Sequence, residues 1–202
     1  MIPGRRGIET RPAGVELRIK VGHWEGDPVV GKDASGYLVT RVERVTRFAR
    51  VGWSPGKEAD VVARVVVVLF MEAGIPVDGI PFDNGKEFAR HELIAQELRE
   101  DVFFARPHHF WERGANENTN GLIRRIYPRQ ASFMAIGEED LQRIDTFLND
   151  RHRRLSRLLR SPLRAIMDAL HTKGTRPPPP ASSQRVALAT GWRVQKTISG
   201  TI

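Results

Sequence analysis

The sequence predicts an α/β layered domain built around a mixed β-sheet. Val- and Thr-rich alternating segments are concentrated in the first quarter of the chain, as is typical of strands. Helical patterns and short apolar runs then alternate, and helices alone follow. With 202 residues, the chain is long enough for one well-buried core plus a tail.

The first three predicted strands form a meander. The segments 23–30 and 37–47 are rich in apolar and β-branched residues, and turn-forming residues at 33–36 separate them. The segment 48–53 continues the sheet after a bend. The order of these strands in the chain predicts antiparallel neighbours.

The middle of the chain alternates between helix and strand. The segment 57–73 has the length of a helix, although its Val-rich centre is also compatible with a buried strand. Asn84 and Glu87 have the spacing of a capping box, which predicts a helix over 85–99. Two short apolar runs predict further strands, at 77–82 and 102–105.

Three more helices are expected in the second half, over 114–127, 138–154 and 161–171. Composition then divides the chain into three parts. Residues 1–20 are predicted to be a linker remnant, and residues 21–171 a folded, integrase-like catalytic domain once the resemblance below is considered. Residues 172–202 contain four consecutive prolines and no acidic residue, which predicts a basic, Pro-rich, disordered tail.

The chain is strongly basic, with a formal net charge of +8 and a pI near 10.5. Lysine and arginine bind nucleic acid by releasing condensed counterions from phosphates, so a polyanionic partner is expected. A merely basic surface is the alternative. The absence of cysteine excludes disulfides and thiolate metal sites, and it fits a reducing compartment. No apolar run is long enough to cross a bilayer.

Acidic residues occur in three segments that together suggest a site. Glu25 and Asp27 occupy alternate positions of a predicted strand, so both face one side. Asp83 ends an apolar strand, and Glu117 lies in the first turn of a helix. Each has a simpler explanation: solvated acids for the first pair, a turn cap for Asp83, and a favourable helix-dipole contact for Glu117.

Taken together, the three segments supply oxygen ligands and no soft ligand. Carboxylate oxygens suit Mg²⁺ or Mn²⁺, which also take water and phosphate oxygens. Two such ions can activate the attacking oxygen and neutralise the leaving oxygen in a phosphodiester displacement. A basic chain with these carboxylates is therefore a candidate for phosphoryl transfer on nucleic acid.

Three motifs make a resemblance specific. The stretches GHWEGD (22–27), FDNGKEFA (82–89) and WERGANENTNGLIR (111–124) resemble the catalytic signatures of the insertion-sequence-thirty family of bacterial DDE transposases. Asp83 and Glu117 are separated by 33 residues, the spacing of the family's second and third acids. The resemblance also includes RPAGVE (11–16), LVTRVERVTRF (38–48) and LNDRHRR (148–154).

The resemblance implies a ribonuclease-H-like fold, the integrase catalytic core, with a mixed five-stranded sheet and flanking helices. It implies that Asp27, Asp83 and Glu117 are the catalytic residues and hold two Mg²⁺ or Mn²⁺ ions. Glu25, Glu87 and Glu112 are then left with structural or supporting roles. The implied activity is metal-dependent cleavage and strand transfer of DNA. The implied partners are transposon ends, target DNA and, in a homo-oligomer, a second copy of the chain. The implied location is the bacterial cytoplasm, at the nucleoid.

Several polar and basic side chains are candidates for contacting DNA. Asn120 and Arg124 follow Glu117 by three and seven positions, on roughly the same helix face, and Lys86 follows Asp83 by three. A basic cluster is expected where one predicted helix ends and the next begins; it contains Arg151, Arg153, Arg154, Arg157, Arg160 and Arg164. The alternative for all of them is a solvated surface.

Two features depart from the family. Pro28 directly follows the first acid, and a proline is disfavoured inside a central strand because it has no N–H. The chain also begins in what would be the linker, which suggests a truncated copy. The alternative function is therefore an inactive remnant that binds DNA nonspecifically or interferes with an intact transposase. A stand-alone ribonuclease-H-like nuclease is a third possibility that the motifs disfavour.

Overall fold

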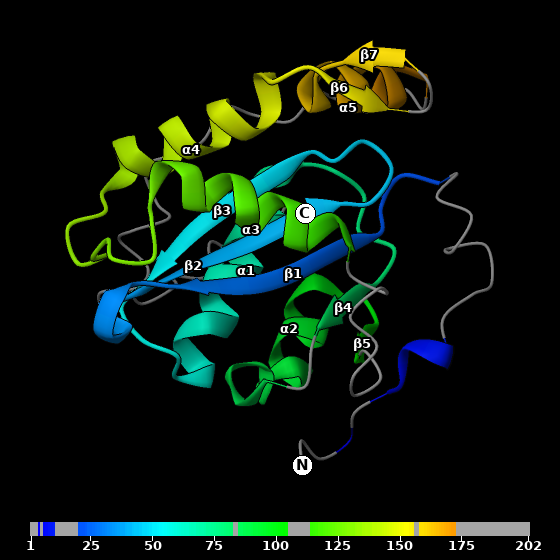
Figure 1. Ribbon diagram of the computed structural model, residues 1–202. Coiled ribbons are helices and arrows are strands. Elements are labelled where there is room, and N and C mark those ends of the chain that lie inside the picture. Colours follow the sequence, from blue (N-terminus) through cyan, green and yellow to red (C-terminus); the bar gives the residue numbers. More distant parts are fainter. Residues whose placement is uncertain are drawn as a thin grey trace, which may run out of the picture.

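Three antiparallel strands form the central sheet of the protein, in the order β1-β2-β3 (Figure 1). They are β1 (Trp24–Val30), β2 (Tyr37–Glu43) and β3 (Ala49–Ser54). The structure is a computed structural model that describes residues 4, 6–10, 20–82, 85–104, 114–155 and 158–172. The predicted meander of three antiparallel strands is confirmed.

A second, parallel pair lies beside this sheet. The strands β4 (Ile80–Phe82) and β5 (Val102–Phe104) pair with each other, and β4 runs alongside β1 (Figure 1). Among the described residues, the hydrogen-bonded ladders join β1-β2-β3 and β4-β5 as separate sheets. The mixed α/β class is thus confirmed, but the expected single five-stranded sheet is not formed by continuous hydrogen bonds.

Two prolines explain the missing ladder between β1 and β4. At the two ends of β1, His23 O accepts from Arg44 N and Gly31 N donates to Gly36 O, so odd-numbered residues face β2. The nitrogen of Pro28 therefore faces away from β2. On β4, Ile80 N donates to Asp101 O toward β5, so the nitrogen of Pro81 faces the other way. The facing edges of β1 and β4 therefore each lack an N–H donor, at Pro28 and at Pro81.

The expectation that Pro28 weakens a central ladder was therefore wrong for the β1–β2 pairing. Pro28 is paired with Val39 at a position that makes no backbone hydrogen bonds to β2. Proline is tolerated where its nitrogen would have no ladder partner. The strand β1, which carries both Asp27 and Pro28, therefore keeps its hydrogen bonds to β2.

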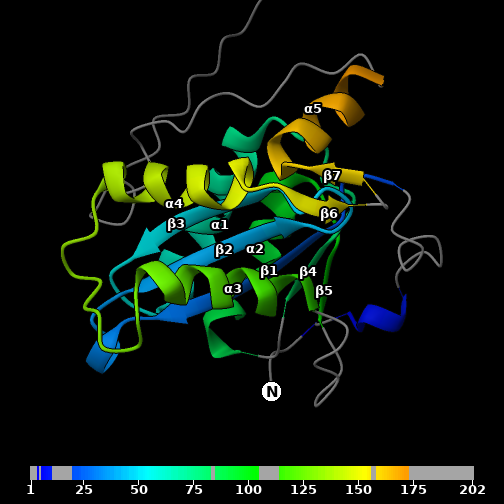
Figure 2. The same ribbon diagram turned by 45° about the horizontal axis from the view of Figure 1, so that its top comes forward.

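Helices cover both faces of the sheet (Figures 1 and 2). The helix α1 (Ala59–Ala73) resolves the helix-or-strand ambiguity of its Val-rich segment, and it ends at Gly74, whose φ of 58° is left-handed. On the other face lie α3 (Gly114–Ile126) and α4 (Glu138–Asp150). The remaining elements are η1 (Ile8–Thr10), η3 (Lys32–Ala34), η4 (Lys86–Phe88), α2 (His91–Leu98), β6 (Arg153–Leu155), β7 (Leu158–Arg160) and α5 (Pro162–Thr172). No helix in the described ranges has the length and apolar character needed to span a membrane.

Alternation along β2 divides the core in two. Val39 points into a cluster shared with α1, whereas Leu38 and Val42 point into a cluster shared with α3 and α4. Gly52 of β3 lies so close to α1 that an added Cβ would be 2.6 Å from Val65. The sheet is therefore held between two apolar layers, and each polar side chain on its faces requires a partner.

Two predicted helices differ from the structure. Over 85–99 the chain forms the short η4 turn and then α2, because Arg90 (φ −92°, ψ 29°) leaves the helical conformation and Phe88 turns inward to stack on Phe82. Asn84 of the predicted capping box lies outside the described residues. The helix expected over 138–154 ends at Asp150, and the hairpin β6–β7 follows it. Arg153, Arg154 and Arg160 of the basic cluster therefore lie on this hairpin and not at a helix–helix junction, while Arg157 lies outside the described residues.

Candidate active site

Asp27 lies in the middle of β1, half-buried, on the sheet face that α3 covers. Its Oδ2 accepts a hydrogen bond of 2.9 Å from Nδ2 of Asn120 on α3. Glu25, two residues earlier, accepts a bond from Asn116 of the same helix. The prediction that the two carboxylates face one side of the sheet is confirmed, and α3 is the element that they face.

Thr40 of β2 contacts both β1 and α3. It is fully buried, opposite Asp27 in the β1–β2 register, and its hydroxyl donates to Asp27 O at 2.7 Å. The hydroxyl oxygen also lies 3.2 Å from Asn116 Oδ1 and 3.4 Å from Asn120 Oδ1. Both the backbone and the carboxylate of Asp27 are thus fixed by neighbours.

Glu117 lies in the first turn of α3, as predicted, and is exposed. Asn120 is one helical turn later, and residues three apart are neighbours on a helix surface. The bond from Asn120 to Asp27 therefore brings the turn that carries Glu117 to the strand that carries Asp27. Asp83 directly follows β4 in sequence but lies outside the described residues. In the part of the chain that is described, no three acidic or histidine side chains form a metal-binding cluster.

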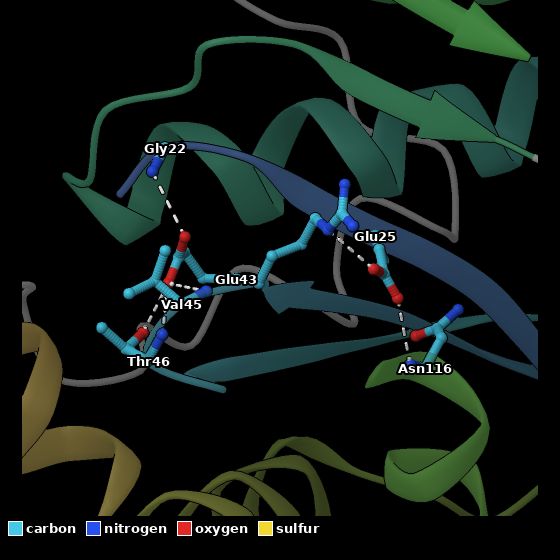
Figure 3. Close-up of polar contacts among 7 residues, drawn as sticks. Gly22, Glu25, Glu43, Val45, Thr46 and Asn116 are labelled. Carbon is cyan, nitrogen blue, oxygen red and sulfur yellow. Dashed lines mark hydrogen bonds and ion pairs between the residues drawn. The ribbon is translucent and has the colours of Figure 1, made fainter. Parts of the chain in front are cut away.

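A buried ion pair lies beside these residues (Figure 3). Glu25 is 1% exposed, and its Oε1 is 3.0 Å from Nε of Arg44, which is 2% exposed. Its Oε2 accepts a bond of 3.3 Å from the backbone N–H of Asn116. The family resemblance implied only a structural or supporting role for Glu25. Its specific partner on α3 lies 91 residues away, and no local pattern indicates it.

A second buried cation, Arg41, lies against Gly26 of the first acidic motif. Arg41 is fully buried, and an added Cβ on Gly26 would be 1.5 Å from its Nη1. Its guanidinium lies over the ring of Phe82, 4.7 Å from the ring centre, and close to the rings of Phe70 and Phe88. The sequence analysis missed Arg41. The glycine between the two acids is the only local sign of the space that this side chain needs.

The candidate DNA contacts on α3 already have protein partners. Asn120 binds Asp27, and Arg124 Nη2 donates to Val30 O at 2.6 Å. Burial, and secondarily the positive charge of Arg129, lowers the pKa of Arg124. Both side chains therefore contribute to fixing α3 on β1, whatever else they contact.

The other candidate contacts differ in exposure. Lys86 and Arg151 are exposed, whereas Arg153 is half-buried and donates from Nη2 to Leu148 O at 2.8 Å. Burial first, and then the charges of Arg151 and Arg47, lower the pKa of Arg153. The side chain of Arg154 lies outside the described residues. Among the candidates whose side chains are described, Lys86, Arg151 and Arg164 are open to solvent, and Arg164 also pairs with Asp168.

The chain is similar in sequence to transposases of bacterial insertion sequences. The chain is 42% identical over 153 residues to the transposase for insertion sequence element IS4351 of Bacteroides fragilis, covering 76% of this chain and 47% of that protein. It is 31% identical over 170 residues to the transposase for element IS1086 of Cupriavidus metallidurans, covering 84% and 50%. It is 32% identical over 150 residues to transposase InsI for element IS30A of Escherichia coli, covering 73% and 38%.

The chain belongs to the IS30 family of insertion-sequence transposases. It spans about half or less of the length of these curated relatives. No protein-family model matches the chain.

Proposed function

We propose that the chain is the catalytic domain of a DDE transposase, which cleaves DNA strands and joins them to a target. The observation that carries the proposal is the hydrogen bond from Asn120 to Asp27. It places the first turn of α3, with Glu117, beside the strand of the first acid. Membership of the transposase family supports this function over that of an inactive remnant.

We further propose that the fold is ribonuclease-H-like. The strand order β3-β2-β1 with β4 alongside β1 and β5 beyond it supports a five-stranded arrangement, 3-2-1-4-5. In this arrangement, β4 is the neighbour of β1, the strand that carries Asp27. Asp83 directly follows the carboxyl end of β4 in sequence. Residues 21–171 would form this domain, with 1–20 and 172–202 as its flanking segments.

The proposed catalytic residues are Asp27, Asp83 and Glu117. Their carboxylate oxygens, together with the absence of cysteine, fit Mg²⁺ or Mn²⁺ and do not fit a soft metal. When bound, two such ions would activate the attacking oxygen and stabilise the leaving oxygen of the phosphodiester. Asn120 would hold the Asp27 carboxylate in one orientation, and Thr40 would hold its backbone.

DNA is the proposed substrate, in the form of transposon ends and target, and the protein would then act at the bacterial nucleoid. Lys86 and Arg151 are exposed cations that could contact phosphates, while Arg153 and Arg154 belong to the neighbouring β6 strand. Phosphate contacts make binding depend steeply on salt. Lys86→Glu or Arg151→Glu should weaken DNA binding and flatten its salt dependence. The control Arg143→Glu, a charge reversal at an exposed position of α4, should weaken DNA binding less.

A nicking and strand-transfer assay on DNA carrying the ends of the parent element tests the function. With Mg²⁺ or Mn²⁺, the unmodified chain should cleave. Asp27→Asn, Asp83→Asn and Glu117→Gln should each lower the rate by at least about a hundredfold, more than the loss of a supporting residue. Glu139→Gln, which changes an exposed carboxylate on α4, is the control. Cleavage that survives all three substitutions would contradict the proposal. Light scattering with and without DNA tests whether a second copy is recruited.

A further inference from the structure

We propose that Glu25 is a positioning residue that fixes the N-terminal turn of α3, and with it Glu117, relative to Asp27. This inference rests on the proposed function. Glu25 is two residues from Asp27 on the same strand face, and it accepts from the backbone N–H of Asn116, the residue before Glu117 (Figure 3). A contact to the backbone fixes the helix itself and not only one side chain.

The position of the contact makes it suited to this task. The first N–H groups of a helix have no partner within the helix, so an acceptor at the first turn determines where that turn lies. Asn116 is 1% exposed and Glu25 is 1% exposed, so the contact is shielded from competing water. Glu117 projects from the adjacent position of the same turn into solvent. The buried side of the turn is held while its exposed side carries the acid.

Arg44 completes the arrangement from β2's end. Its Nε is 3.0 Å from Glu25 Oε1, which leaves Oε2 directed at Asn116. A buried carboxylate needs such a cation, and the pair in turn restricts the carboxylate to one orientation. The Glu25 carboxyl group is thereby paired with a cation in the interior, next to the helix turn that it contacts.

Glu43 provides a matched comparison on the same sheet. It is also a fully buried glutamate, but its oxygens accept bonds from Gly22, Val45 and Thr46, and none of these described partners belongs to α3 (Figure 3). Replacing Glu43 by a neutral residue disturbs the β2–β3 turn, whereas replacing Glu25 by a neutral residue disturbs the contact that holds the first turn of α3 against β1. The two substitutions therefore separate loss of a buried charge from loss of helix position.

The experiment measures helix position and metal binding in the full chain. Because the chain has no cysteine, nitroxide labels can be attached at Asn118→Cys on α3 and Arg64→Cys on α1, both exposed, and their distance distribution measured by pulsed electron resonance. Mn²⁺ binding to the DNA-free protein is measured by calorimetry. The variants are Glu25→Gln, the charge-neutral double variant Glu25→Leu/Arg44→Met, Glu43→Gln, and Val66→Ala as a control for general loosening of the α1 core.

The expected result is a broader or shifted label distance in both Glu25 variants and a loss of Mn²⁺ affinity of at least about tenfold. Glu43→Gln and Val66→Ala should leave both readouts close to those of the unmodified chain. If a folded Glu25 variant keeps the narrow distance, or if the controls broaden it equally, Glu25 does not position α3. If the unmodified chain binds no Mn²⁺, the proposed function fails, while the label distances still decide the role of Glu25.

Discussion

Asn120 Nδ2 donates a hydrogen bond of 2.9 Å to Oδ2 of Asp27, across 93 positions of sequence. A side-chain amide at this position orients the carboxylate and links a helix to the central sheet. If the proposed function holds, we expect Asn120→Ala to lower the rate of metal-dependent cleavage by about 10- to 100-fold at saturating DNA, the effect of losing a supporting contact to Asp27, the proposed metal ligand. A lower affinity for DNA with an unchanged maximal rate would instead indicate that Asn120 mainly contacts DNA.

Pro28 should be nearly neutral for stability, because its nitrogen faces away from β2 and toward β4, with which β1 forms no hydrogen-bonded ladder among the described residues. Urea unfolding of Pro28→Val is expected to change the free energy of unfolding by less than about 1 kcal/mol. Val29→Pro is the matched control, because residue 29 faces β2 and would lose a ladder bond there. Val29→Pro should lower the free energy of unfolding by about 1–3 kcal/mol. A large gain from Pro28→Val would show that the proline does strain β1.

Gly26 should not tolerate a side chain. An alanine Cβ would be 1.5 Å from Arg41 Nη1, and the guanidinium is enclosed by three phenylalanine rings. We expect Gly26→Ala to lower the free energy of unfolding by about 1–3 kcal/mol through overpacking. Gly121→Ala on α3 is the control, since nothing lies within 4 Å of the added Cβ there. It should stabilise the helix by about 0.5–1 kcal/mol. Equal effects at both positions would contradict the packing around Arg41.

Asn149 should be essential to the outer edge of β3. Its side chain accepts from Ala49 N and donates to Ala49 O, both at 2.8 Å, so α4 satisfies an edge of β3 that no strand of the described ranges covers. Asn149→Leu would leave both backbone groups unpaired in the interior, and each costs about 1–3 kcal/mol. Chemical denaturation compares it with Gln142→Leu, an exposed change on the same helix that should stay within about 0.5 kcal/mol.

Glu43 should make stability depend on pH. Burial is the main effect on its carboxyl, and it raises the pKa above the ordinary value of 4.5, although hydrogen bonds from Thr46, Val45 and Gly22 oppose the shift. The folded state therefore favours the protonated form. The resulting contribution to stability is present below about pH 4.5 and is lost as the pH rises through the folded pKa. The melting temperature of the unmodified chain minus that of Glu43→Gln should fall as the pH increases above 4.5. A difference that stays constant or rises would contradict this.

Local patterns were enough for most elements of the fold. A strand-like run predicted β1, alternation predicted β2, and β3 was expected as a continuation of the sheet after a bend. The segment with Glu117 in the first turn of α3 was also predicted correctly. Strand periodicity also placed Glu25 and Asp27 on one face. These features depend on neighbouring residues, so a single sequence contains the information.

Where a local rule competed with a distant contact, the prediction was wrong. The expected helix over 138–154 stops at Asp150, after the side chain of Asn149 has paired with Ala49, and Arg153 then donates back to Leu148 O. The capping-box pattern did not yield one long helix, because Phe88 turns inward onto Phe82. In both places, a contact made by the folded chain determines the local conformation.

Residue identity and short-range periodicity were enough to predict the α/β class, the three acidic motifs and the family. How the motifs are held could be learned only from the folded chain. The contacts of Glu25 with Asn116 and of Asp27 with Asn120 span more than 90 residues, and the direction in which the Pro28 nitrogen faces depends on which edge of β1 pairs with β2. Such relationships follow from the packing of α3 on the sheet, because chain segments far apart in sequence become neighbours only when their apolar faces are buried together.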